Sequence, residues 1–461
     1  MNSYRKGDEI SDRLHQLVPG GGHTYSKGDD QFPRRSPRIL VRAQGAYCWD
    51  ADGNKFLDWA MGNRVIILGH GYPAVNEAVK RQMDLGLNFT RPSILEHELA
   101  EYLTQLFPVA EMVKFGKNGS DVTTAAVRLS RAYTGRKYVA YCAEHPFFST
   151  HDWFIGTTAM NSGVPSEVSG LTLRFSYNNI GSLEQLFARY PKQIAAVILE
   201  PVKNDEPKED FLPKLRDITR REGSVLIFDE MISGLRFDLR GAHHLYKVTP
   251  DLACYGKAIS NGFAFSLLAG KREIMKLGGL HHDSRRVFLL SQTHSSESVG
   301  LAACKATLQE CERIGISDHV WKIGKKLVSE TRKIAREEGV QDHVRVLGFD
   351  CNPQILCTND KGAYWPELHT AFHEEVIARG VLIPWTSITY SHGDAELSLT
   401  MEALRAGMKK VRKAVESGNV RLHFEGDAVK PVFRPFNRCR QSRCGRLDPE
   451  AAKLDCCLEP E

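Results

Sequence analysis

An acidic and a basic residue each close an apolar run in the middle of the chain. Asp229 follows Val225–Phe228, and Lys257 follows Leu252–Tyr255 and Gly256. In an open α/β sheet, ligands bind in the crevice at the carboxyl ends of the strands. A lysine whose stem is buried offers a neutral amine for a Schiff base, and a carboxylate can keep a pyridine nitrogen protonated. The two residues together suit pyridoxal phosphate, which needs both groups to act as an electron sink.

A glycine-containing turn lies upstream of these residues. Asn118, Gly119 and Ser120 precede the amphipathic pattern of residues 122–129. Asn and Ser are favoured at helix N-termini, where backbone N–H groups bind anions. We therefore expect this turn to hold the cofactor phosphate, although many helices begin in this way and bind nothing.

Aromatic residues follow the apolar run 138–142. Phe147 and Phe148 stand in the segment His145-Pro146-Phe147-Phe148-Ser149. An aromatic ring at a strand end can stack on a flat heterocycle, and packing in the core is an equally open alternative. Lys257 alone could be a solvated loop residue, and Asp229 alone could be a helix cap. The succession of turn, aromatic, acid and lysine, each after a strand, favours one cofactor site.

Short apolar runs alternate with helical patterns between about residues 114 and 270. The runs are 138–142, 195–199, 225–228, 252–255 and 266–269. This alternation predicts a mostly parallel sheet wrapped by helices, an α/β fold. Helical spacing is also found at 9–17, 73–85, 95–107, 298–312, 318–338 and 394–416, a hairpin pattern at 45–58, and strand patterns at 344–349, 354–358 and 381–384.

The same patterns divide the chain. We expect an N-terminal arm with part of a small domain (1–75), a large cofactor-binding domain (76–335), a C-terminal small domain (336–437) and a flexible tail (438–461) that contains cysteine and arginine. The tail cysteines, Cys439, Cys444, Cys456 and Cys457, lack the usual spacing of a zinc site. Free thiols are therefore the simpler interpretation, and no metal site is predicted.

Composition bounds the function. The chain has 461 residues, 42% hydrophobic and 25% charged, with a net charge of +5. This balance does not favour nucleic-acid binding. No apolar stretch reaches the roughly 18 residues of a membrane span, and the N-terminus lacks the apolar core of a signal peptide. We expect a cytoplasmic protein whose eleven cysteines are mostly reduced.

The motifs resemble those of the class III aminotransferases of fold type I, in the branch that includes glutamate-1-semialdehyde aminomutase. The resemblance extends from about Pro19 to Asn437. Its most specific segments are 228–236 and 256–263, and it is supported by 45–58, 68–73 and 199–202. It implies a large domain with a mostly parallel sheet and a smaller α+β domain built from both termini.

The resemblance also implies roles for the residues of the motifs. Lys257 would form the Schiff base with pyridoxal 5′-phosphate and then move a proton between substrate and cofactor carbons. Asp229 would pair with the pyridine nitrogen. Asn118, Gly119 and Ser120 would hold the phosphate.

Further positions are implied in the same way. Phe147 occupies the place of a stacking Tyr and Phe148 that of a His. Glu200 joins the cofactor-binding set. Thr293 matches a threonine that reaches the phosphate of the neighbouring subunit, which implies a homodimer with active sites at the interface. Residues 295–297, Ser-Ser-Glu, replace a glycine- and asparagine-rich turn, and similar segments occur in an offshoot associated with sugar and cell-surface polysaccharide pathways.

Several reactions remain open within this cofactor class. The first is transamination from an amino-acid donor, glutamate by default, to an aldehyde or ketone. The second is the intramolecular amino transfer of the aminomutases, and decarboxylation or racemisation comes third. A non-catalytic binding protein on the same fold is an alternative that the intact Lys257 and Asp229 disfavour.

Residues near the N-terminus bear on the substrate. Thr24 and Lys27 stand nearest to the Ser and Arg with which the aminomutases recognise the substrate carboxylate. A lysine keeps the charge but lacks the bidentate fork of arginine. We read this as favouring a bulkier, hydroxylated carbonyl substrate, such as a sugar, a polysaccharide precursor or a secondary-metabolite precursor. Lys27 or Arg64 could bind the donor carboxylate, because segment 385–392 contains no arginine.

Overall fold

The computed structural model describes residues 3–145, 148–208 and 210–437. It consists of two compact units. The large unit is Pro73–Ser317, and the terminal unit combines the chain up to Tyr72 with the chain from Asp318 onward. Phe147 and the tail cysteines lie outside the described residues.

A seven-stranded sheet forms the centre of the large unit, with the order β4-β10-β9-β8-β7-β5-β6. Its strands are β4 (Met112–Gly116), β5 (Tyr138–Cys142), β6 (Thr172–Phe175), β7 (Ile194–Leu199), β8 (Val225–Asp229), β9 (Leu252–Tyr255) and β10 (Ser266–Gly270). Strand β10 is antiparallel to β4 and β9, and the pairs from β9 through β6 are parallel. The mostly parallel sheet is confirmed, and the carboxyl ends of β5, β7, β8 and β9 meet at one edge.

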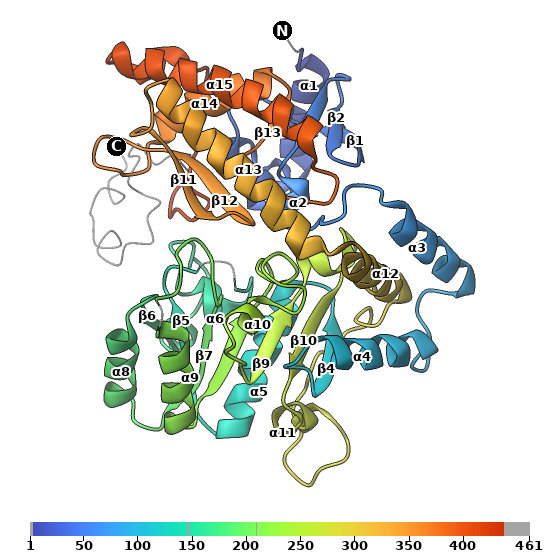
Figure 1. The fold of residues 1–461 in the computed structure, drawn as a ribbon. Helices are drawn as coiled ribbons and strands as arrows, with labels where there is room; N and C mark the ends of the chain where they lie inside the picture. Colours follow the sequence, from blue (N-terminus) through green and yellow to red (C-terminus); the bar gives the residue numbers. More distant parts are fainter. Residues whose placement is uncertain (1–2, 146–147, 209, 438–461) are drawn as a thin grey trace. The chain divides into compact units, whose positions relative to one another are not determined.

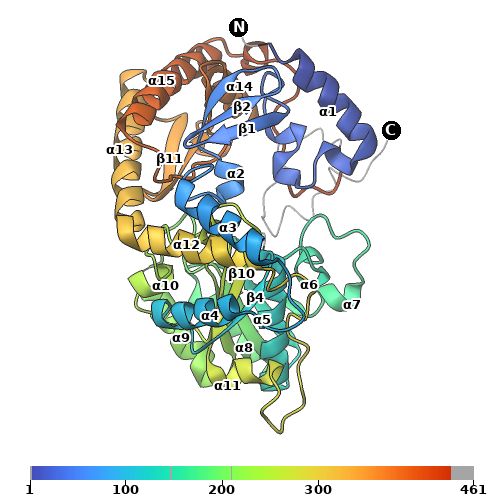
Figure 2. The ribbon, with the colours of Figure 1, turned by 90° about the vertical axis from the view of Figure 1, so that its right-hand side faces the viewer.

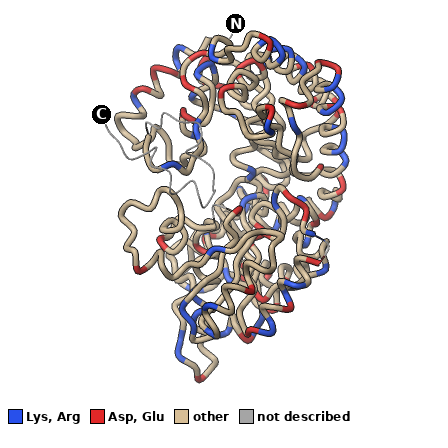
Figure 3. The backbone as a smooth tube through the Cα atoms, turned by 90° about the vertical axis from the view of Figure 1, so that its left-hand side faces the viewer, with Lys and Arg blue, Asp and Glu red and all other residues tan. Residues whose placement is uncertain are grey.

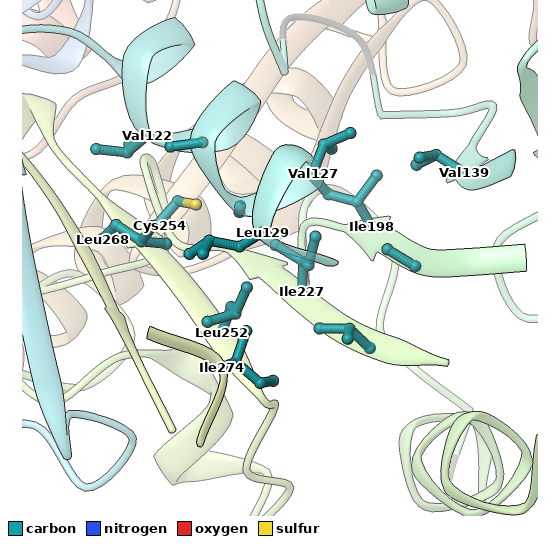
Figure 4. Packing of buried hydrophobic residues seen from close by; sticks show 14 of the residues in the cluster. Val122, Val127, Leu129, Val139, Ile198, Ile227, Leu252, Cys254, Leu268 and Ile274 are labelled. Atoms are coloured by element: carbon teal, nitrogen blue, oxygen red, sulfur yellow. The ribbon is translucent and has the colours of Figure 1, made fainter. Parts of the chain in front are cut away.

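Helices cover both faces of this sheet. Helix α5 (Gly119–Thr134) packs on one face, and α8 (Ile180–Arg189) and α9 (Phe211–Glu222) pack on the other (Figure 1). Side chains alternate along a strand, so neighbouring residues serve opposite faces. Figure 4 shows the α5 side, where Val122, Val127 and Leu129 lie with Ile198, Ile227 and Leu252.

Three longer helices complete the large unit. Helices α3 (Pro73–Leu85) and α4 (Ile94–Leu106) pack on α12 (Ser298–Ile314), as Figure 2 shows for α3. The short helices are η4 (Lys257–Ser260), α6 (Asp152–Ile155), α7 (Ser166–Ser169), α10 (Ala242–Leu245), α11 (Arg272–Met275) and η5 (Lys276–Gly278). Glycine ends both α5 and α12, at Gly135 and Gly315, in the left-handed conformation that favours this residue.

The terminal unit contains a four-stranded sheet of order β1-β2-β3-β13 and the hairpin β11-β12. Its elements are β1 (Leu40–Gln44), β2 (Tyr47–Asp50), β3 (Lys55–Asp58), β11 (Val344–Phe349), β12 (Asn352–Cys357), β13 (Val381–Leu382), α1 (Arg5–Leu17), α2 (Met61–Arg64), α13 (Ile316–Glu337), α14 (Pro366–Ala378), α15 (Asp394–Glu416) and the short η1 (Pro19–Gly21), η2 (Tyr25–Lys27), η3 (Asp29–Gln31) and η6 (Val420–His423). The hairpin expected at 45–58 is present as the antiparallel pair β2–β3.

Two elements of this unit differ from the sequence prediction. Helix α1 begins at Arg5 rather than Glu9. Its early N–H groups, those of Lys6 and Gly7, donate to the Asp52 carboxylate at 3.0 and 2.8 Å, a long-range cap. Strand β13 stops at Leu382, two residues before Pro384, which has no N–H for a ladder.

Charged residues and buried thiols occur in both units. Figure 3 shows cationic and anionic residues interspersed along the backbone. Within the described ranges, no helix combines the length and apolar composition that a membrane crossing requires. The described cysteines are all buried and none forms a disulfide: Cys48, Cys142, Cys254, Cys304, Cys311, Cys351 and Cys357.

Candidate active site

Two buried acids occupy the carboxyl ends of neighbouring strands. Asp229 is the last residue of β8, and Glu200 directly follows β7. Leu199 pairs with Phe228, so the two acids leave the sheet at adjacent positions. Alternation puts both on the face covered by α5. Their exposed fractions are only 3% for Asp229 and 4% for Glu200.

Asp229 carries an incompletely compensated charge. Burial raises its pKa to about 7, the charge of Glu200 acts in the same direction, and the charge of Lys257 opposes both. Its Oδ1 accepts a hydrogen bond of 2.9 Å from the N–H of Met231. A buried carboxylate in this condition gains from any cationic N–H brought beside it, as a protonated pyridine nitrogen would be.

Lys257 begins the short helix η4, directly after Gly256 at the end of β9. Its backbone φ is +50°, in the left-handed region. Non-glycine residues seldom adopt this conformation, and those that do cluster at functional sites. The lysine is partly buried, and its charge influences the pKa of both Asp229 and Glu200. The structure therefore brings the predicted lysine and acid together.

Glu200 has a cation of its own. Lys203 Nζ donates to Glu200 Oε1 at 2.7 Å. Burial opposes ionisation of Glu200, but Lys203, His145 and Lys257 together outweigh it and hold the pKa of the carboxyl below its ordinary value. The N–H of Glu200 donates to Nδ1 of His145 at 3.1 Å, so the ring proton of His145 is on Nε2. Burial lowers the pKa of His145 to about 3, which keeps this ring neutral.

Sequence reasoning missed Lys203 and gave His145 no role. Both are polar residues in loops that follow strands of the parallel sheet, β7 and β5. That position, rather than any motif, is the signal that could have drawn attention to them.

The turn before α5 is organised by a capping box. Asn118 Oδ1 accepts from the N–H of Asp121 at 3.2 Å, and Asp121 Oδ2 accepts from the N–H groups of Lys117 and Asn118 at 3.0 Å each. Ser120 Oγ accepts from the N–H of Thr150 at 2.8 Å. The turn is thereby set in place at a helix N-terminus, the end that attracts anions.

Met231 links this turn to the lysine and the acid. A Cβ added to Gly119 would lie 3.2 Å from Met231 Sδ, and one added to Gly256 would lie 2.6 Å from the same atom. The turn, the residue before Lys257 and the residue two after Asp229 therefore converge. A helix N-terminus for a phosphate, a lysine amine and a buried acid in one place fit pyridoxal phosphate.

Thr293 is exposed in the segment that precedes α12. Asn88 Nδ2 donates to its carbonyl oxygen at 3.0 Å. Glu297 ends the segment and caps α12, accepting from the N–H of Val299 at 2.8 Å. Lys117 Nζ donates to Glu297 Oε2 at 2.7 Å, so the segment is joined to the phosphate turn.

The other predicted site residues are Phe147, Phe148, Thr24, Lys27 and Arg64. Phe147 is outside the described residues, whereas Phe148 is 1% exposed and belongs to the core beside α5. Thr24 and Lys27 are exposed in the terminal unit, and Arg64 ends α2 there with a φ of +67°. The substrate roles of these three residues stay predictions.

Residues 31–413 match the model of the aminotransferase class-III family. The chain belongs to this family. This match confirms the resemblance noted in the sequence. It also confirms the prediction that the chain is an enzyme of this family with pyridoxal 5′-phosphate as its cofactor.

Two similar proteins are named for different reactions. The chain is 32% identical over 414 residues to a 3-aminobutyryl-CoA aminotransferase of Cloacimonas acidaminovorans strain Evry, covering 88% of this chain and 97% of the relative. It is 29% identical over 432 residues to a glutamate-1-semialdehyde 2,1-aminomutase of Alkaliphilus metalliredigens strain QYMF, covering 89% and 97%.

Solved structures agree on the fold. An omega-transaminase from Sphaerobacter thermophilus superposes with a TM-score of 0.79 at 26% identity, covering 89% of this chain and all of that one. The FumI protein of Sphingopyxis sp. MTA144 superposes with a TM-score of 0.82 at 23% identity, covering 90% and 98%. The predicted fold type I is confirmed.

Proposed function

We propose that the chain is an aminotransferase that moves an amino group from an amino-acid donor, glutamate by default, to the carbonyl of an aldehyde or ketone. One observation carries the proposal. Asp229 and Glu200 lie at adjacent strand ends, and the charge of Lys257 acts on the pKa of both. Both acids are on the sheet face covered by α5, the helix that begins with the phosphate turn.

The residues divide the work. When bound, pyridoxal phosphate supplies an electron sink for the bonds at the amine-bearing carbon. Lys257 would hold the cofactor through its amine and, once the substrate amine has displaced it, the freed amine would carry a proton at the reacting carbon. Asp229 holds the pyridine N–H. Asn118, Gly119 and Ser120 hold the phosphate. Glu200 follows the strand next to that of Asp229, and its charge raises the pKa of Asp229. We assign the ring of Phe147 to stack on the cofactor.

A homodimer is the second part of the proposal, with Thr293 reaching the phosphate of the partner. Exposed apolar side chains in and after α3 support it: Met83 (55%), Leu85 (72%), Leu87 (46%), Phe89 (48%) and Ile94 (71%). This surface adjoins the Thr293 segment, because Ser298 donates its N–H to the carbonyl oxygen of Leu87 at 2.8 Å. Apolar exposure on this scale is typical of a protein interface. Light scattering of the purified chain at micromolar concentration tests it, and a monomer would reject it.

The acceptor we propose is a bulky, hydroxylated carbonyl compound such as a keto sugar. Lys27 and Thr24, in place of the Arg and Ser of the aminomutases, support this choice because a lysine does not grip a carboxylate with two parallel hydrogen bonds. The Ser295-Ser296-Glu297 turn supports it further. Amino transfer to a panel of keto sugars and of keto acids, after loading with the amino form of the cofactor, tests the assignment. Reaction with keto acids alone would reject it.

An aminomutase is the second candidate, favoured by the full-length relative of that name. The visible spectrum of the purified protein separates the two. A yellow band bleached by one amino acid supports transamination and identifies the donor. A yellow protein bleached by no amino acid, yet converting glutamate semialdehyde to aminolevulinate at an ordinary enzymatic rate, supports the mutase. A protein that stays colourless with added pyridoxal phosphate would reject both.

A further inference from the structure

A half-buried ion pair joins the phosphate turn to the segment that contains Thr293. Lys117 Nζ lies 2.7 Å from Glu297 Oε2, and the two side chains are 18% and 23% exposed. The same ammonium donates to the carbonyl oxygen of Glu297 at 3.4 Å. Charge-assisted hydrogen bonds at this burial are stronger than those of exposed pairs. The pair is therefore a firm link between residues far apart in the sequence.

Lys117 is fixed at its own end by the capping box of α5. Its N–H donates to Asp121 Oδ2, which also receives the N–H of Asn118. Any movement of the phosphate turn must move these N–H groups. The ion pair transmits such a movement from Lys117 to Glu297.

Glu297 is fixed with equal firmness at the start of α12. Its carboxylate accepts from the N–H groups of Val299 and Gly300 at 2.8 and 3.4 Å, and its own N–H donates to the carbonyl oxygen of His294 at 3.1 Å. A Cβ at Gly300 would lie 3.0 Å from Lys117 Nζ and 2.7 Å from the carbonyl oxygen of Ala264. The packing leaves the pair little room to rearrange.

The ion pair thus connects two helix N-termini, one of which holds the cofactor phosphate in the proposed function. We propose that Lys117 and Glu297 are positioning residues that couple occupancy of the phosphate turn to the order of the Thr293 segment. The inference rests on the proposed function, in which that segment reaches the partner's phosphate. Coupling of this kind is reciprocal, so a disordered Thr293 segment weakens cofactor binding at the turn.

Four variants test the coupling: K117M, E297Q, the double variant K117M/E297Q, and the charge swap K117E/E297K. K305M is the matched control, because Lys305 lies on α12, the helix that Glu297 caps, and pairs with Glu98 of α4 at 2.6 Å. Glutamine at 297 keeps an oxygen for the cap of α12. Each apoprotein is titrated with pyridoxal phosphate by absorbance, and hydrogen exchange of residues 291–297 is measured with and without the cofactor.

We expect K117M and E297Q each to weaken cofactor binding about three- to thirtyfold, and the double variant to be no weaker than the worse single one. K305M should bind as the wild type does. Cofactor should slow exchange in residues 291–297 of the wild type and of K305M, but less in K117M. Partial recovery in the charge swap would support the pair itself.

Additive effects in the double variant, or equal cofactor protection of residues 291–297 in wild type and K117M, would overturn the inference. Thermal unfolding of each apoprotein identifies a variant that fails to fold, in which case E297Q and the control decide the question. If wild-type protein does not bind pyridoxal phosphate at all, the proposed function fails. If it binds and the variants match it, only the coupling fails.

Discussion

Two buried aspartates lie at opposite ends of neighbouring strands in the large sheet. Asp229 ends β8, whereas Asp251 directly precedes β9. Asp251 receives two hydrogen bonds from Arg216, at 2.7 and 3.0 Å, and one from the N–H of Leu226 at 2.9 Å, and it pairs with Lys271 at 2.6 Å. Burial opposes its ionisation, but these partners outweigh burial and lower its pKa.

Asp229 is buried to the same degree, yet its pKa is raised rather than lowered. The difference lies in compensation. The acid at the amino end of the strands is paired within the chain itself, and it holds the sheet together. The acid at the carboxyl end has a second carboxylate beside it, and its cation is Lys257, the lysine that we propose binds the cofactor. Burial alone therefore does not mark a site; buried charge left for a ligand to neutralise does.

The two lysines that face these acids offer the largest contrast. We expect K257A to reduce turnover by at least about a thousandfold in a protein that still folds, because no other amine would replace its proposed bond to the cofactor. K271A should leave kcat unchanged and lower stability. Steady-state kinetics with calorimetry measures both. Multiple turnovers at wild-type rate in K257A would contradict the assignment.

The acids themselves form the next comparison. D229N should lower kcat by about a hundredfold or more while the apoprotein stays folded, since an amide cannot pair with a pyridinium. D251N should instead destabilise the protein by about 3–5 kcal/mol, because it leaves Arg216 and Lys271 without their buried partner. Urea unfolding and single-turnover rates measure the two effects. The comparison breaks down if both variants lose stability equally.

Acid–base behaviour sharpens the same contrast. The pKa of Asp229 is about 7 in the folded apoprotein and about 4 in an unfolded chain. As pH rises from about 4 to about 7 the unfolded state ionises first, so this residue costs the fold stability over that window. Asp251, with its lowered pKa, stabilises the fold above its unfolded pKa and loses that effect as pH falls.

We therefore compare the melting temperatures of the D229N and wild-type apoproteins. The melting temperature of D229N, relative to that of the wild type, should rise by a few degrees between pH 4 and 7 and stay constant at higher pH. Cofactor should remove the difference, because the pyridinium then compensates Asp229. Scanning calorimetry at stepped pH measures it. A gain that is constant from pH 4 upward would refute the raised pKa.

Two glycines near these acids provide the smallest test. A Cβ at Gly256 lies 2.6 Å from the Met231 thioether, a flexible side chain, and 3.6 Å from the backbone oxygen of Phe265, whereas one at Gly270 lies 2.8 Å from the backbone oxygen of Asp251. We expect G256A to weaken cofactor binding a few-fold at little cost in stability. G270A should cost about 1–3 kcal/mol and leave cofactor affinity unchanged. Cofactor titration and thermal melts of both variants measure this, and reversed outcomes would contradict the contrast.

The elements with strong apolar runs were predictable from the sequence. Strands β5 and β9 and helices α3 and α15 match their predicted bounds, because local patterning determines them. Strand β6 was not predicted, since its burial depends on pairing with β5, a distant segment. Helix α14 was also missed. It is buried nearly all round and includes His369, Thr370 and His373, so its polar residues hide the apolar face that a sequence pattern would reveal.

The site divides along the same line. Lys257, Asp229 and the turn at 118–120 could be predicted because each stands next to a strand or helix signal in the sequence. Lys203 and the Lys117–Glu297 pair were not, because an ion pair between distant segments leaves no periodicity in a single sequence. Such pairs form only when the fold brings the distant segments together.

The buried thiols allow local unfolding to be measured in each unit. Cys48 and Cys351 lie in the terminal unit, and Cys142, Cys254 and Cys304 lie in the large one. Burial raises the pKa of the described thiols for which a shift is resolved, so a thiol-reactive dye modifies them only through opened states. Modification rates assigned to individual cysteines by mass spectrometry would then measure the opening of each unit separately, without any introduced cysteine.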